Sequence, residues 1–529
     1  MKIEKVSPIK LLLPQGLEGR IYLDKLRKTL GYEDKRVTYE LLTWKKVKAK
    51  DDAWLLLTRE KQQQQLRHWF PAKFGSVALD EKIKELDKAR FKSCLFQEDG
   101  KYYTYTGLQG IVERATGLET LTTYKKLTPD DWKPLPWATQ PHEPRWYQTK
   151  TLDLLVPEDG SRMHGAAELG TGLGKTLILA MVLRRIGLSA VVVTPTLSIA
   201  EQALADFSRW FGKSKVSQFF GGKKKSDKLI TVAVAKSLAN VVKGDPHYDN
   251  LFNKKVLLVD ETHLAPPDSL STVIFGLLSN CQYRYFFSGT VLRNDGLDLL
   301  LDAITGDIVF RMSVEQGIKE KYLAPLKFFQ YRIKADSDKK IEDPIKATRV
   351  HLHQNKNVYK HVANLINCAV AQKNRKVLVL VDTVDQYKYL LDAGLTVPSK
   401  FAHGPLSADN RDSVPQDQWK LDPMDLVAEF DEFKFPVLVA TGCVSIGTDI
   451  KYADLLVNIV GLASEIEIRQ GVGRGTRLPV GKTDCIYVDY NVIQSDEDDK
   501  LWTLSRHAAK RREIFNNIYG ECRVLDAKI

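Results

Sequence analysis

The eight residues Leu-Gly-Thr-Gly-Leu-Gly-Lys-Thr, from Leu169 to Thr176, constrain the fold more than any other part of this sequence. Apolar residues precede this segment, and an amphipathic stretch from Leu177 to Ile186 follows it. The pattern predicts a buried strand, a glycine-rich loop and a helix, an arrangement in which backbone N–H groups surround phosphates at the helix N-terminus. The strict phosphate-loop pattern has Gly where this chain has Leu169, so the match is incomplete by one residue.

Two side chains of the loop fit phosphate chemistry directly. The ammonium group of Lys175 can reach the β- and γ-phosphates of a nucleoside triphosphate, and the hydroxyl of Thr176 can hold Mg²⁺. We therefore predict that the loop binds ATP and Mg²⁺. The residues expected to contact the nucleotide here are Thr171, Gly172, Gly174, Lys175 and Thr176.

A second segment supplies carboxylates. The apolar run from Val256 to Val259 predicts a short buried strand, and Asp-Glu-Thr-His follows it at residues 260–263. Ligands and catalytic groups gather at the C-terminal ends of strands in open parallel sheets. Asp260 can hold Mg²⁺ through water, and Glu261 can orient or deprotonate the attacking water.

Three more motifs follow in order: Ser-Gly-Thr at 288–290, Gly-Thr-Asp at 447–449 and Gln-Gly-Val-Gly-Arg-Gly-Thr-Arg at 470–477. Together with the two segments above and with Arg-Trp-Tyr-Gln at 145–148, this set resembles the superfamily 2 helicases with a DExH box. The resemblance extends over residues 145–477. It implies a nucleic-acid-dependent ATPase in which two RecA-like domains clamp ATP and nucleic acid between them.

The resemblance assigns further roles in the first domain. His263 would be a relay between the nucleotide and the pair Ser288 and Thr290. Gln148 would read the edge of the adenine, with Arg145 or an aromatic side chain packing nearby.

In the second domain the resemblance makes Arg474 and Arg477 arginine fingers. Guanidinium groups neutralise the charge that spreads onto the γ-phosphate oxygens, and here they would reach it only when the two domains close. Gln470 would contact the nucleotide or the attacking water, and Asp449 would couple the nucleotide to the loop that contacts the nucleic-acid strand. Hydrolysis would therefore be linked to domain movement.

Other segments match positions at which these helicases hold the nucleic-acid backbone. Hydroxyl groups, glycine amides and helix N-termini contact phosphates without reading bases, so we expect little sequence specificity from the motor. The Gly-Gly-Lys-Lys-Lys segment at 221–225 is either a basic DNA-facing loop or a solvated turn. The matching positions are Thr194, Pro195, Thr196, Lys236, Ser237, Thr383, His403, Gly404, Thr441 and Gly442.

The alternation of buried strands and helices predicts an α/β protein with two RecA-like parallel-sheet domains in tandem, preceded by a small basic α+β module. We place the N-terminal module at 1–140 and expect it to bind nucleic acid. The first, ATP-binding domain is expected at 141–315, the second domain at 316–495 and a C-terminal helix at 496–529. Five prolines within 128–144 indicate a linker into the motor.

Within the N-terminal module we expect a helix at 21–30, strands at 37–43 and 53–58, and a hairpin around the Asp-Gly turn at 99–100. Asp-Gly-Lys at this turn matches the end of a restriction-type nuclease site only superficially, because the hairpin accounts for it. The module holds 27 Lys and Arg against 19 Asp and Glu, in a chain with a net charge of +12. This imbalance favours a polyanionic partner, and nucleic acid is the obvious one.

Composition excludes several other classes of protein. With 43% hydrophobic and 27% charged residues, the chain has the composition of a globular protein. No apolar run reaches the length of a membrane span, and the first residues lack the apolar core of a signal peptide. The six scattered cysteines, with no CxxC pair, argue against zinc, an iron–sulfur cluster or a disulfide framework. We expect a protein of the cytoplasm of a bacterium or a phage-infected host.

The last motif narrows the choice within the superfamily. Residues 470–477 are of the Q-x-x-G-R-x-x-R type, and His263 stands where DEAD-box RNA helicases have Asp. The remaining group contains RecG, XPB, restriction-enzyme motor subunits and phage helicases of the UvsW type. Resemblance to the phage members implies branch migration, fork regression or annealing on duplex or branched DNA, in recombination, repair or replication. The alternatives are an RNA helicase or RNA-stimulated ATPase, the motor subunit of a restriction-type complex, and a binding module with a degenerate motor.

Overall fold

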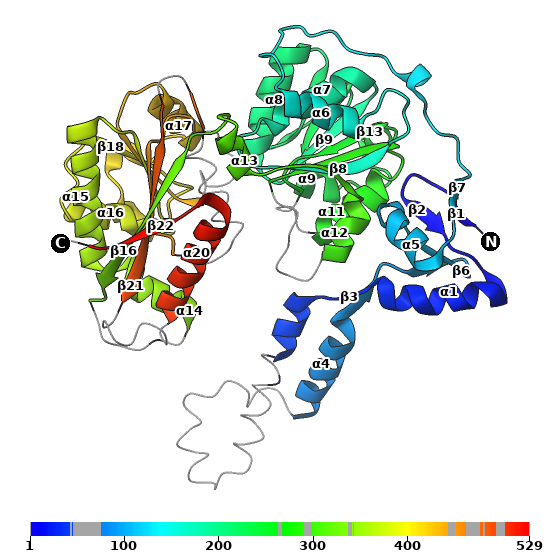
Figure 1. Cartoon of the computed structure of the whole chain (residues 1–529), viewed down its shortest axis with the longest axis horizontal. Coiled ribbons are helices and arrows are strands. Elements are labelled where there is room, and N and C mark those ends of the chain that lie inside the picture. The colour runs from blue at the N-terminus through cyan, green and yellow to red at the C-terminus, as the bar shows by residue number, and fades with distance from the viewer. Residues whose placement is uncertain are drawn as a thin grey trace.

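The computed structural model describes residues 2–42, 45, 76–262, 267–289, 298–336, 341, 343–442, 450–461, 477–479, 482–493 and 503–527. These residues form an N-terminal module and two α/β domains, each built on its own sheet (Figure 1). No helix within these ranges combines the length and the apolar character that crossing a membrane requires.

The first domain is an eight-stranded sheet in the order β11-β10-β12-β9-β13-β14-β8-β15. Its strands pair in parallel except for the hairpin β10–β11. Since β14 lies between β8 and β13, the segments that follow these strands meet at one edge of the sheet. The strands are β8 (His164–Leu169), β9 (Ala190–Thr194), β10 (Val216–Phe220), β11 (Lys223–Lys224), β12 (Ile230–Val234), β13 (Val256–Val259), β14 (Tyr283–Ser288) and β15 (Ile308–Met312).

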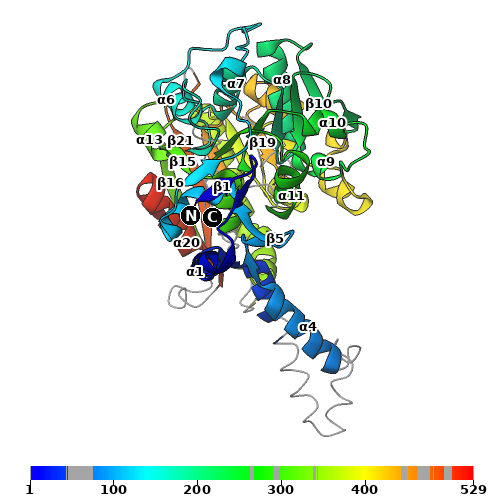
Figure 2. The same ribbon diagram turned by 90° about the vertical axis from the view of Figure 1, so that its right-hand side faces the viewer.

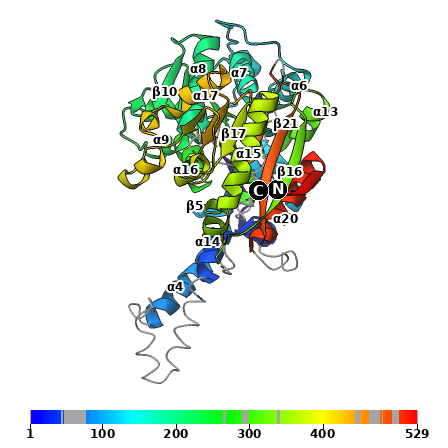
Figure 3. The same cartoon turned by 90° about the vertical axis from the view of Figure 1, so that its left-hand side faces the viewer.

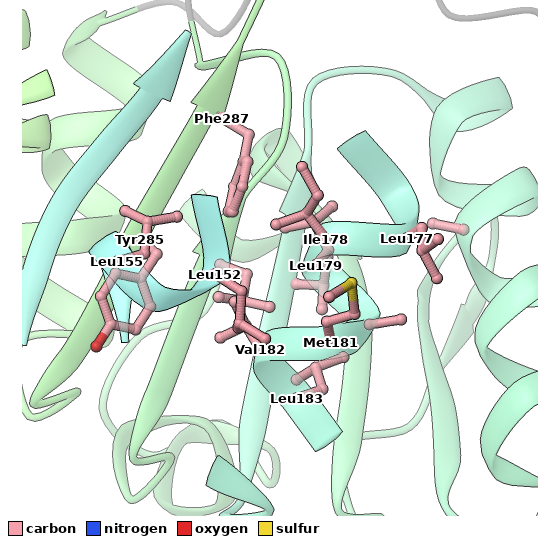
Figure 4. Packing of buried hydrophobic residues seen from close by; sticks show 14 of the residues in the cluster. Leu152, Leu155, Leu177, Ile178, Leu179, Met181, Val182, Leu183, Tyr285 and Phe287 are labelled. Atoms are coloured by element: carbon pink, nitrogen blue, oxygen red, sulfur yellow. The ribbon is translucent and has the colours of Figure 1, made fainter. Parts of the chain in front are cut away.

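Helix α7 (Lys175–Ile186) anchors the phosphate loop in the core of this domain. Its Leu, Ala and Met residues favour a helix, and Gly187 with a φ of 64° ends it in the left-handed conformation that glycine adopts readily. Its apolar side chains pack with those of α6 (Trp146–Leu155) and of β14 (Figure 4). The other helices are α8 (Leu197–Phe211), α9 (Ala235–Ala239), α10 (Tyr248–Phe252), α11 (Pro267–Thr272), α12 (Asp298–Thr305) and α13 (Val314–Lys319).

The second domain is a seven-stranded parallel sheet in the order β18-β19-β17-β20-β21-β16-β22. Its central strands are runs of Val and Leu buried on both faces, as expected for a parallel sheet covered by helices. The strands are β16 (Leu326–Lys334), β17 (Val377–Leu380), β18 (Ser399–Ala402), β19 (Val437–Ala440), β20 (Leu455–Asn458), β21 (Cys485–Ile493) and β22 (Cys522–Asp526). The helices are α14 (Pro344–Thr348), α15 (Lys356–Lys373), α16 (Asp385–Asp392), α17 (Pro423–Asp431) and α20 (Thr503–Tyr519).

The C-terminal segment corrects one expectation. The predicted helix is confirmed as α20, but a helix alone at 496–529 is wrong, because β22 follows it. Strand β22 pairs in parallel with β16 along the edge of the second sheet. Its residues 523–526 are exposed, so no alternation of apolar and polar residues marked them as a strand; pairing with β16 decides their conformation. The C-terminal segment is therefore part of the second domain.

The N-terminal module is a five-stranded sheet in the order β5-β6-β2-β1-β7, with a two-stranded ribbon of β3 and β4 beside it. Helix α4 extends from this ribbon away from the rest of the protein (Figures 2 and 3). The strands are β1 (Ile3–Lys5), β2 (Lys10–Leu12), β3 (Gly31–Glu33), β4 (Phe91–Ser93), β5 (Phe96–Glu98), β6 (Lys101–Tyr105) and β7 (Thr120–Thr122). The helices are α1 (Gly16–Thr29), α4 (Ser76–Ala89) and α5 (Gln109–Thr116).

Of the predictions for this module, the helix and the hairpin are confirmed and one strand is wrong. The helix expected at 21–30 is confirmed as part of α1, and the hairpin is confirmed, with Glu98 opposite Lys101 and φ values of 49° and 76° at residues 99–100. The strand expected at 37–43 is wrong, because residues 35–42 are helical. Its β-branched residues Val37 and Thr38 favoured a strand locally, and tertiary context overrode that preference. The strand expected at 53–58 lies outside the described residues.

The N-terminal module and the first domain share one hydrophobic core. Ile3 and Leu11 of the module are fully buried in the same cluster as Phe286 of β14. The ring of Tyr105 stacks on that of Phe275, with centroids 3.8 Å apart. Separating the two parts would expose this apolar surface to water, so they form one structural unit.

Polar contacts fix the same interface. The buried guanidinium of Arg284, on β14, donates through Nη2 to the hydroxyl of Thr106 at 2.6 Å and to the carbonyl of Pro8. The backbone approaches closely at Gly107, where an added Cβ would lie 2.3 Å from the carbonyl oxygen of Ala303. The accessory module is therefore built onto the ATP-binding domain.

The segment predicted as a linker at 128–144 lies along the first domain. The amides of Lys133 and Leu135 donate to the last turn of α7, at 2.9 Å each, and that of Ala138 donates to the carbonyl of Trp210 at 2.7 Å. The ring of Trp137 packs on Phe211 at 5.2 Å. The segment thus connects the module to the first domain as an ordered stretch of chain, hydrogen-bonded to the ends of α7 and α8.

A buried ion pair joins α20 to the second sheet. The Arg511 Nε lies 3.0 Å from both carboxylate oxygens of Asp489, and both side chains are almost fully buried. The remaining guanidinium nitrogens donate to the carbonyls of Gly461 and Tyr490, at 2.8 Å each. Gln330 donates a further hydrogen bond to Asp489 at 2.9 Å. Every guanidinium nitrogen therefore has an acceptor.

We expect Arg511→Met to lower the free energy of unfolding by about 3–5 kcal/mol, because it leaves the Asp489 carboxylate buried without a counter-charge. Arg332→Met is the matched control, since Arg332 pairs with Asp526 at the exposed edge of the same sheet and should contribute less than about 1 kcal/mol. Urea unfolding followed by tryptophan fluorescence measures both. Equal losses of unfolding free energy in the two variants would show that burial does not increase the contribution of the Arg511–Asp489 pair.

Candidate nucleotide-binding and hydrolysis site

The phosphate loop has a backbone that requires its glycines. Gly172 and Gly174 have φ values of 93° and 76°, in the region that favours glycine. An added Cβ at Gly170 would lie 2.6 Å from the Val314 side chain. Leu169, the departure from the strict pattern, is the last residue of β8 and is fully buried in the core. It therefore serves packing, and the turn itself needs glycine only from residue 170 on.

Lys175 and Glu261 form an ion pair between the loop and the acidic segment. The Lys175 Nζ lies 2.8 Å from the Glu261 Oε1 and donates to the Leu169 carbonyl at 3.3 Å. The two side chains are 8% and 16% exposed, so water screens this pair little. The predicted phosphate-binding cation thus lies directly against the predicted base.

The acidic segment is tied to the end of β14. Glu261 has a φ of 45°, an uncommon backbone conformation for a residue other than glycine. Its amide donates to the Asp260 Oδ1 at 2.9 Å, and its Oε2 accepts from the amide of Gly289 at 3.2 Å. Thr262 donates to the carbonyl of Phe287 at 3.2 Å. These contacts fix the orientation of the two carboxylates at the edge of the sheet.

The carboxyl group of Asp260 lies where a negative charge is poorly stabilised. Burial raises the pKa of its carboxyl well above the usual range, the charge of Glu261 adds to this effect, and Lys175 opposes it. Asp260 and Thr176 line the same cleft, and their oxygens are the ligands that Mg²⁺ prefers. The residues therefore fit Mg²⁺, which when bound would supply positive charge to the phosphate oxygens.

The Arg-Trp-Tyr-Gln segment braces the phosphate loop. Gln148 is buried, accepts from the amide of Arg145 at 2.9 Å and donates to the carbonyls of Leu173 and Gly174 at 3.2 and 3.3 Å. The hydroxyl of Tyr147 also donates to Leu173, at 2.9 Å. Recognition of adenine by Gln148 stays a prediction, and the structure adds a second role, because this side chain holds the turn before α7.

The cleft that contains these groups is lined by both domains. Its volume is about 580 Å³. Arg477 of the second domain lines this cleft beside the phosphate loop. Its Nη1 atom lies close to Gly172, because a Cβ atom added to Gly172 would be only 3.2 Å from it. An arginine that comes from one domain and lies at the phosphate loop of the other is what the arginine-finger role requires.

Some lining residues were missed by sequence reasoning. Lys451 enters the cleft from the second domain, and its position just after the Gly-Thr-Asp motif at 447–449 was the available signal. The guanidinium carbon of Arg145 lies 4.9 Å from the centre of the Tyr322 ring. Tyr322 belongs to the segment between the two domains. Side chains of α8, which carry no motif, complete the cleft: Ile199, Gln202, Ala203, Asp206, Arg209 and Trp210.

Five predicted site residues lie outside the described residues: His263, Thr290, Asp449, Gln470 and Arg474. Their roles stay predictions. Ser288, the described member of the proposed relay, is buried at the end of β14 beside the acidic segment.

The expected nucleic-acid contacts follow the ends of parallel strands in both sheets. Thr194 ends β9 and residues 195–196 follow it, while residues 235–237 follow β12 in the first domain. In the second domain Thr383 follows β17, residues 403–404 follow β18 and residues 441–442 follow β19. The topology therefore places each group at the carboxyl edge of its sheet.

Two of these side chains are buried and make their polar contacts within the protein. The hydroxyl of Thr194 donates to the carbonyl of Thr196 at 3.2 Å. The ring nitrogens of His403 lie 2.6 Å from the carbonyl of Gly404 and 3.2 Å from that of Gln418. These two side chains shape the loops, and the backbone around them is what the sheet edge presents.

Residues 141–292 match the family model described as the type III restriction enzyme res subunit, and residues 357–479 match the helicase conserved C-terminal domain. The chain belongs to superfamily 2 of the helicases. This helicase is a nucleic-acid-dependent ATPase with two tandem RecA-like domains.

Two relatives agree with this membership, and a solved structure shares the fold. The chain is 25% identical to the probable helicase D10 of Escherichia phage T5, over 65% of this chain and 70% of that protein. It is 24% identical to the DNA 3′-5′ translocase XPB2 of Sulfurisphaera tokodaii, over 65% of this chain and 81% of that protein. The restriction-modification enzyme LlaBIII bound to DNA has the same fold, with a TM-score of 0.53 and 12% identity over 73% of this chain and 32% of that one.

We expect Glu261→Gln to bind ATP normally and to hydrolyse it at least ~10²-fold more slowly, because the amide cannot accept a proton from water. Lys175→Ala should abolish hydrolysis by removing the ammonium group that faces the phosphates. Steady-state ATPase assays with purified proteins measure both, and thermal unfolding checks that the fold is kept. Near-normal turnover by either variant would contradict the assigned roles.

Arg477→Ala should keep most of the nucleotide affinity and lose hydrolysis by roughly 10³-fold, because the guanidinium acts on charge that develops in the transition state. The same result is expected for Arg474→Ala. Arg332→Ala, an exposed arginine of the same domain remote from the cleft, is the control and should be active. A weaker affinity with unchanged turnover at saturating ATP would show that Arg477 contributes to ground-state binding alone.

Proposed function

We propose that this helicase is an ATP-driven DNA translocase that acts on duplex or branched DNA. Its activity would be branch migration, fork regression or annealing in recombination, repair or replication, in the cytoplasm of a bacterium or a phage-infected host. The observation that carries the proposal is the position of Arg477 beside Gly172. When hydrolysis needs groups from both domains, each turnover requires them to close, and nucleic acid held by both is displaced.

The residues take the following parts in the proposed reaction. Lys175 would neutralise the β- and γ-phosphates, while Thr176 and Asp260 would hold Mg²⁺. Glu261 takes a proton from the attacking water, and its hydrogen bond from Gly289 keeps the carboxylate aimed. Gln470 and the two arginines of the second domain complete the site on closure. The Lys175–Glu261 ion pair must break before Glu261 can accept the proton from water. ATP binding is thereby linked to the release of the catalytic base.

One observation favours DNA as the substrate, and a second favours a nucleic acid of either kind. The relative XPB2 is described as a DNA translocase, and it matches 65% of this chain. The excess of positive charge in residues 1–140 favours a polyanion. Backbone contacts at the strand ends would hold that DNA with little regard to sequence.

We assign the choice of branched DNA to the N-terminal module. Its shared core with the first domain supports this proposal, because the module then moves with the ATP-binding domain through every cycle. The ring of Tyr105 in this module packs on Phe275 and so is not available to stack on bases. Deleting the module would strip apolar cover from the first domain, so substitutions on its surface are the better test.

The motor subunit of a restriction-type complex is the second candidate. The family model matched by residues 141–292 and the LlaBIII structure favour it. Such a motor would hydrolyse ATP on DNA without processing junctions, whereas the proposed translocase would process junctions by itself.

ATPase stimulation across nucleic-acid structures tests the proposal. We expect four-way junctions and forks to stimulate hydrolysis several-fold more than single strands of equal length, with duplex DNA between them and RNA weakest. Lys175→Ala controls for contaminating ATPase, and loss of a labelled junction into its product duplexes reports branch migration. RNA as the best activator would favour an RNA helicase, and ATPase without junction processing would favour the restriction-type motor.

A further inference from the structure

Six lysines and one aspartate occupy residues 213–228. They follow the outer edge of the first sheet, where β10 lies next to α8 (Figures 2 and 3). Three of them, Lys223, Lys224 and Lys225, stand exposed on the β10–β11 hairpin, which we call the lysine hairpin. No lysine of this stretch forms an ion pair with a carboxylate in the part of the chain that the structure describes. The charge of this edge is therefore uncompensated.

The backbone of the lysine hairpin has a defined conformation and is anchored in the core. Gly221 and Gly222 have φ values of 58° and 77°, the pattern of a two-residue type I′ turn. The amide of Lys225 closes the ladder by donating to the carbonyl of Gln218 at 2.9 Å. Phe219, on β10, is fully buried and anchors the hairpin in the core. Three ammonium groups are thus presented from a fixed backbone, which lowers the entropy lost on binding.

A groove beside the hairpin adds further cations. It has a volume of about 560 Å³ and lies between α8 and β10. Arg209, Lys213 and Lys223 line its walls, and Glu201 is the one carboxylate among the described lining residues. Arg209 pairs with Asp206 at 2.7 Å, which leaves the two lysines to supply the net charge. Cationic donors on both walls suit phosphate groups.

The position of the hairpin links it to the expected nucleic-acid track. Residues 194–196 lie at the end of β9 and residues 235–237 follow β12, and β10 lies next to β12 in the sheet. The turn at 221–222 follows β10 at the same carboxyl edge. Going outward along this edge, the lysine hairpin is therefore the next group after the two sets of expected phosphate contacts.

We propose that the lysine hairpin binds the phosphate backbone of duplex DNA and extends the motor's track by one strand of the sheet. The proposal rests on the proposed function, since it assumes that DNA lies along this edge. Lysines on an edge strand have another known use, which is to block pairing with the edge of a second molecule. Charge reversal separates the two uses, because Glu repels another edge as Lys does but cannot attract phosphate.

The test compares two triple variants with the same change in net charge. The first is Lys223→Glu, Lys224→Glu and Lys225→Glu. The control is Lys346→Glu, Lys360→Glu and Lys373→Glu, which alters exposed lysines on α14 and α15 of the second domain. Fluorescence anisotropy of labelled duplex DNA, measured over a series of salt concentrations, gives the affinity and its salt dependence.

The hairpin variant should bind duplex DNA at least ~10-fold more weakly near 100 mM salt, with a log–log salt slope shallower by about 2–3, because each phosphate contact contributes about 0.9 to that slope. The control should stay within about 3-fold of the unchanged protein. Lys→Arg at the three hairpin positions should restore binding. Should the Glu variant lose its thermal unfolding transition, Lys→Gln at the same positions is measured, and an intermediate loss of affinity is expected.

Equal affinities and slopes in the hairpin and control variants would overturn the proposal and leave edge protection as the role of these lysines. If the unchanged protein shows DNA-stimulated ATPase while the hairpin variant binds DNA as well as the control, this proposal alone fails. Absence of DNA binding by the unchanged protein would overturn both this proposal and the proposed function.

Discussion

The parallel pairing of β13, β14 and β8 determines where the phosphate loop and the acidic segment of the candidate site lie. It turns three strand ends to one edge of the sheet, so Lys175, Glu261 and Gly289 meet although long stretches of sequence separate them. Hydrogen bonds within the sheet are satisfied by the strands themselves, which leaves the loops at this edge free to hold polar groups. Burial then makes charge expensive there, and the raised pKa of Asp260 is its result.

Two further contacts convert this edge into part of a motor. Arg477 comes from the second domain to the phosphate loop, so the cleft is complete only when both domains contribute. The N-terminal module is joined to the first domain by a continuous core and by the buried Arg284. The module and the first domain therefore form one body, and the second domain contributes to the cleft from its own sheet.

Prediction from sequence succeeded where local signals were strong. The glycine loop before α7 was recognised because apolar periodicity and glycine spacing agree, and the turn at 99–100 because Asp-Gly adopts positive φ values easily. It failed at 35–42, where β-branched residues lie in a helix, and at β22, whose conformation comes from pairing with β16. The cleft side chains of α8 were missed, because a helix without a motif gives no sign of which face meets a ligand.

The sequence by itself determined the two parallel sheets and the residues at their carboxyl ends, because hydrophobic period and motif spacing are local properties. Only the tertiary structure decided that Gln148 braces the phosphate loop and that Lys451 enters the cleft from the second domain. It also decided that the N-terminal module shares a core with the first domain and that the segment at 128–144 is hydrogen-bonded along that domain. These outcomes depend on contacts between residues distant in the chain, whose pairing is selected by the burial of apolar surface and by the demand of buried polar groups for partners.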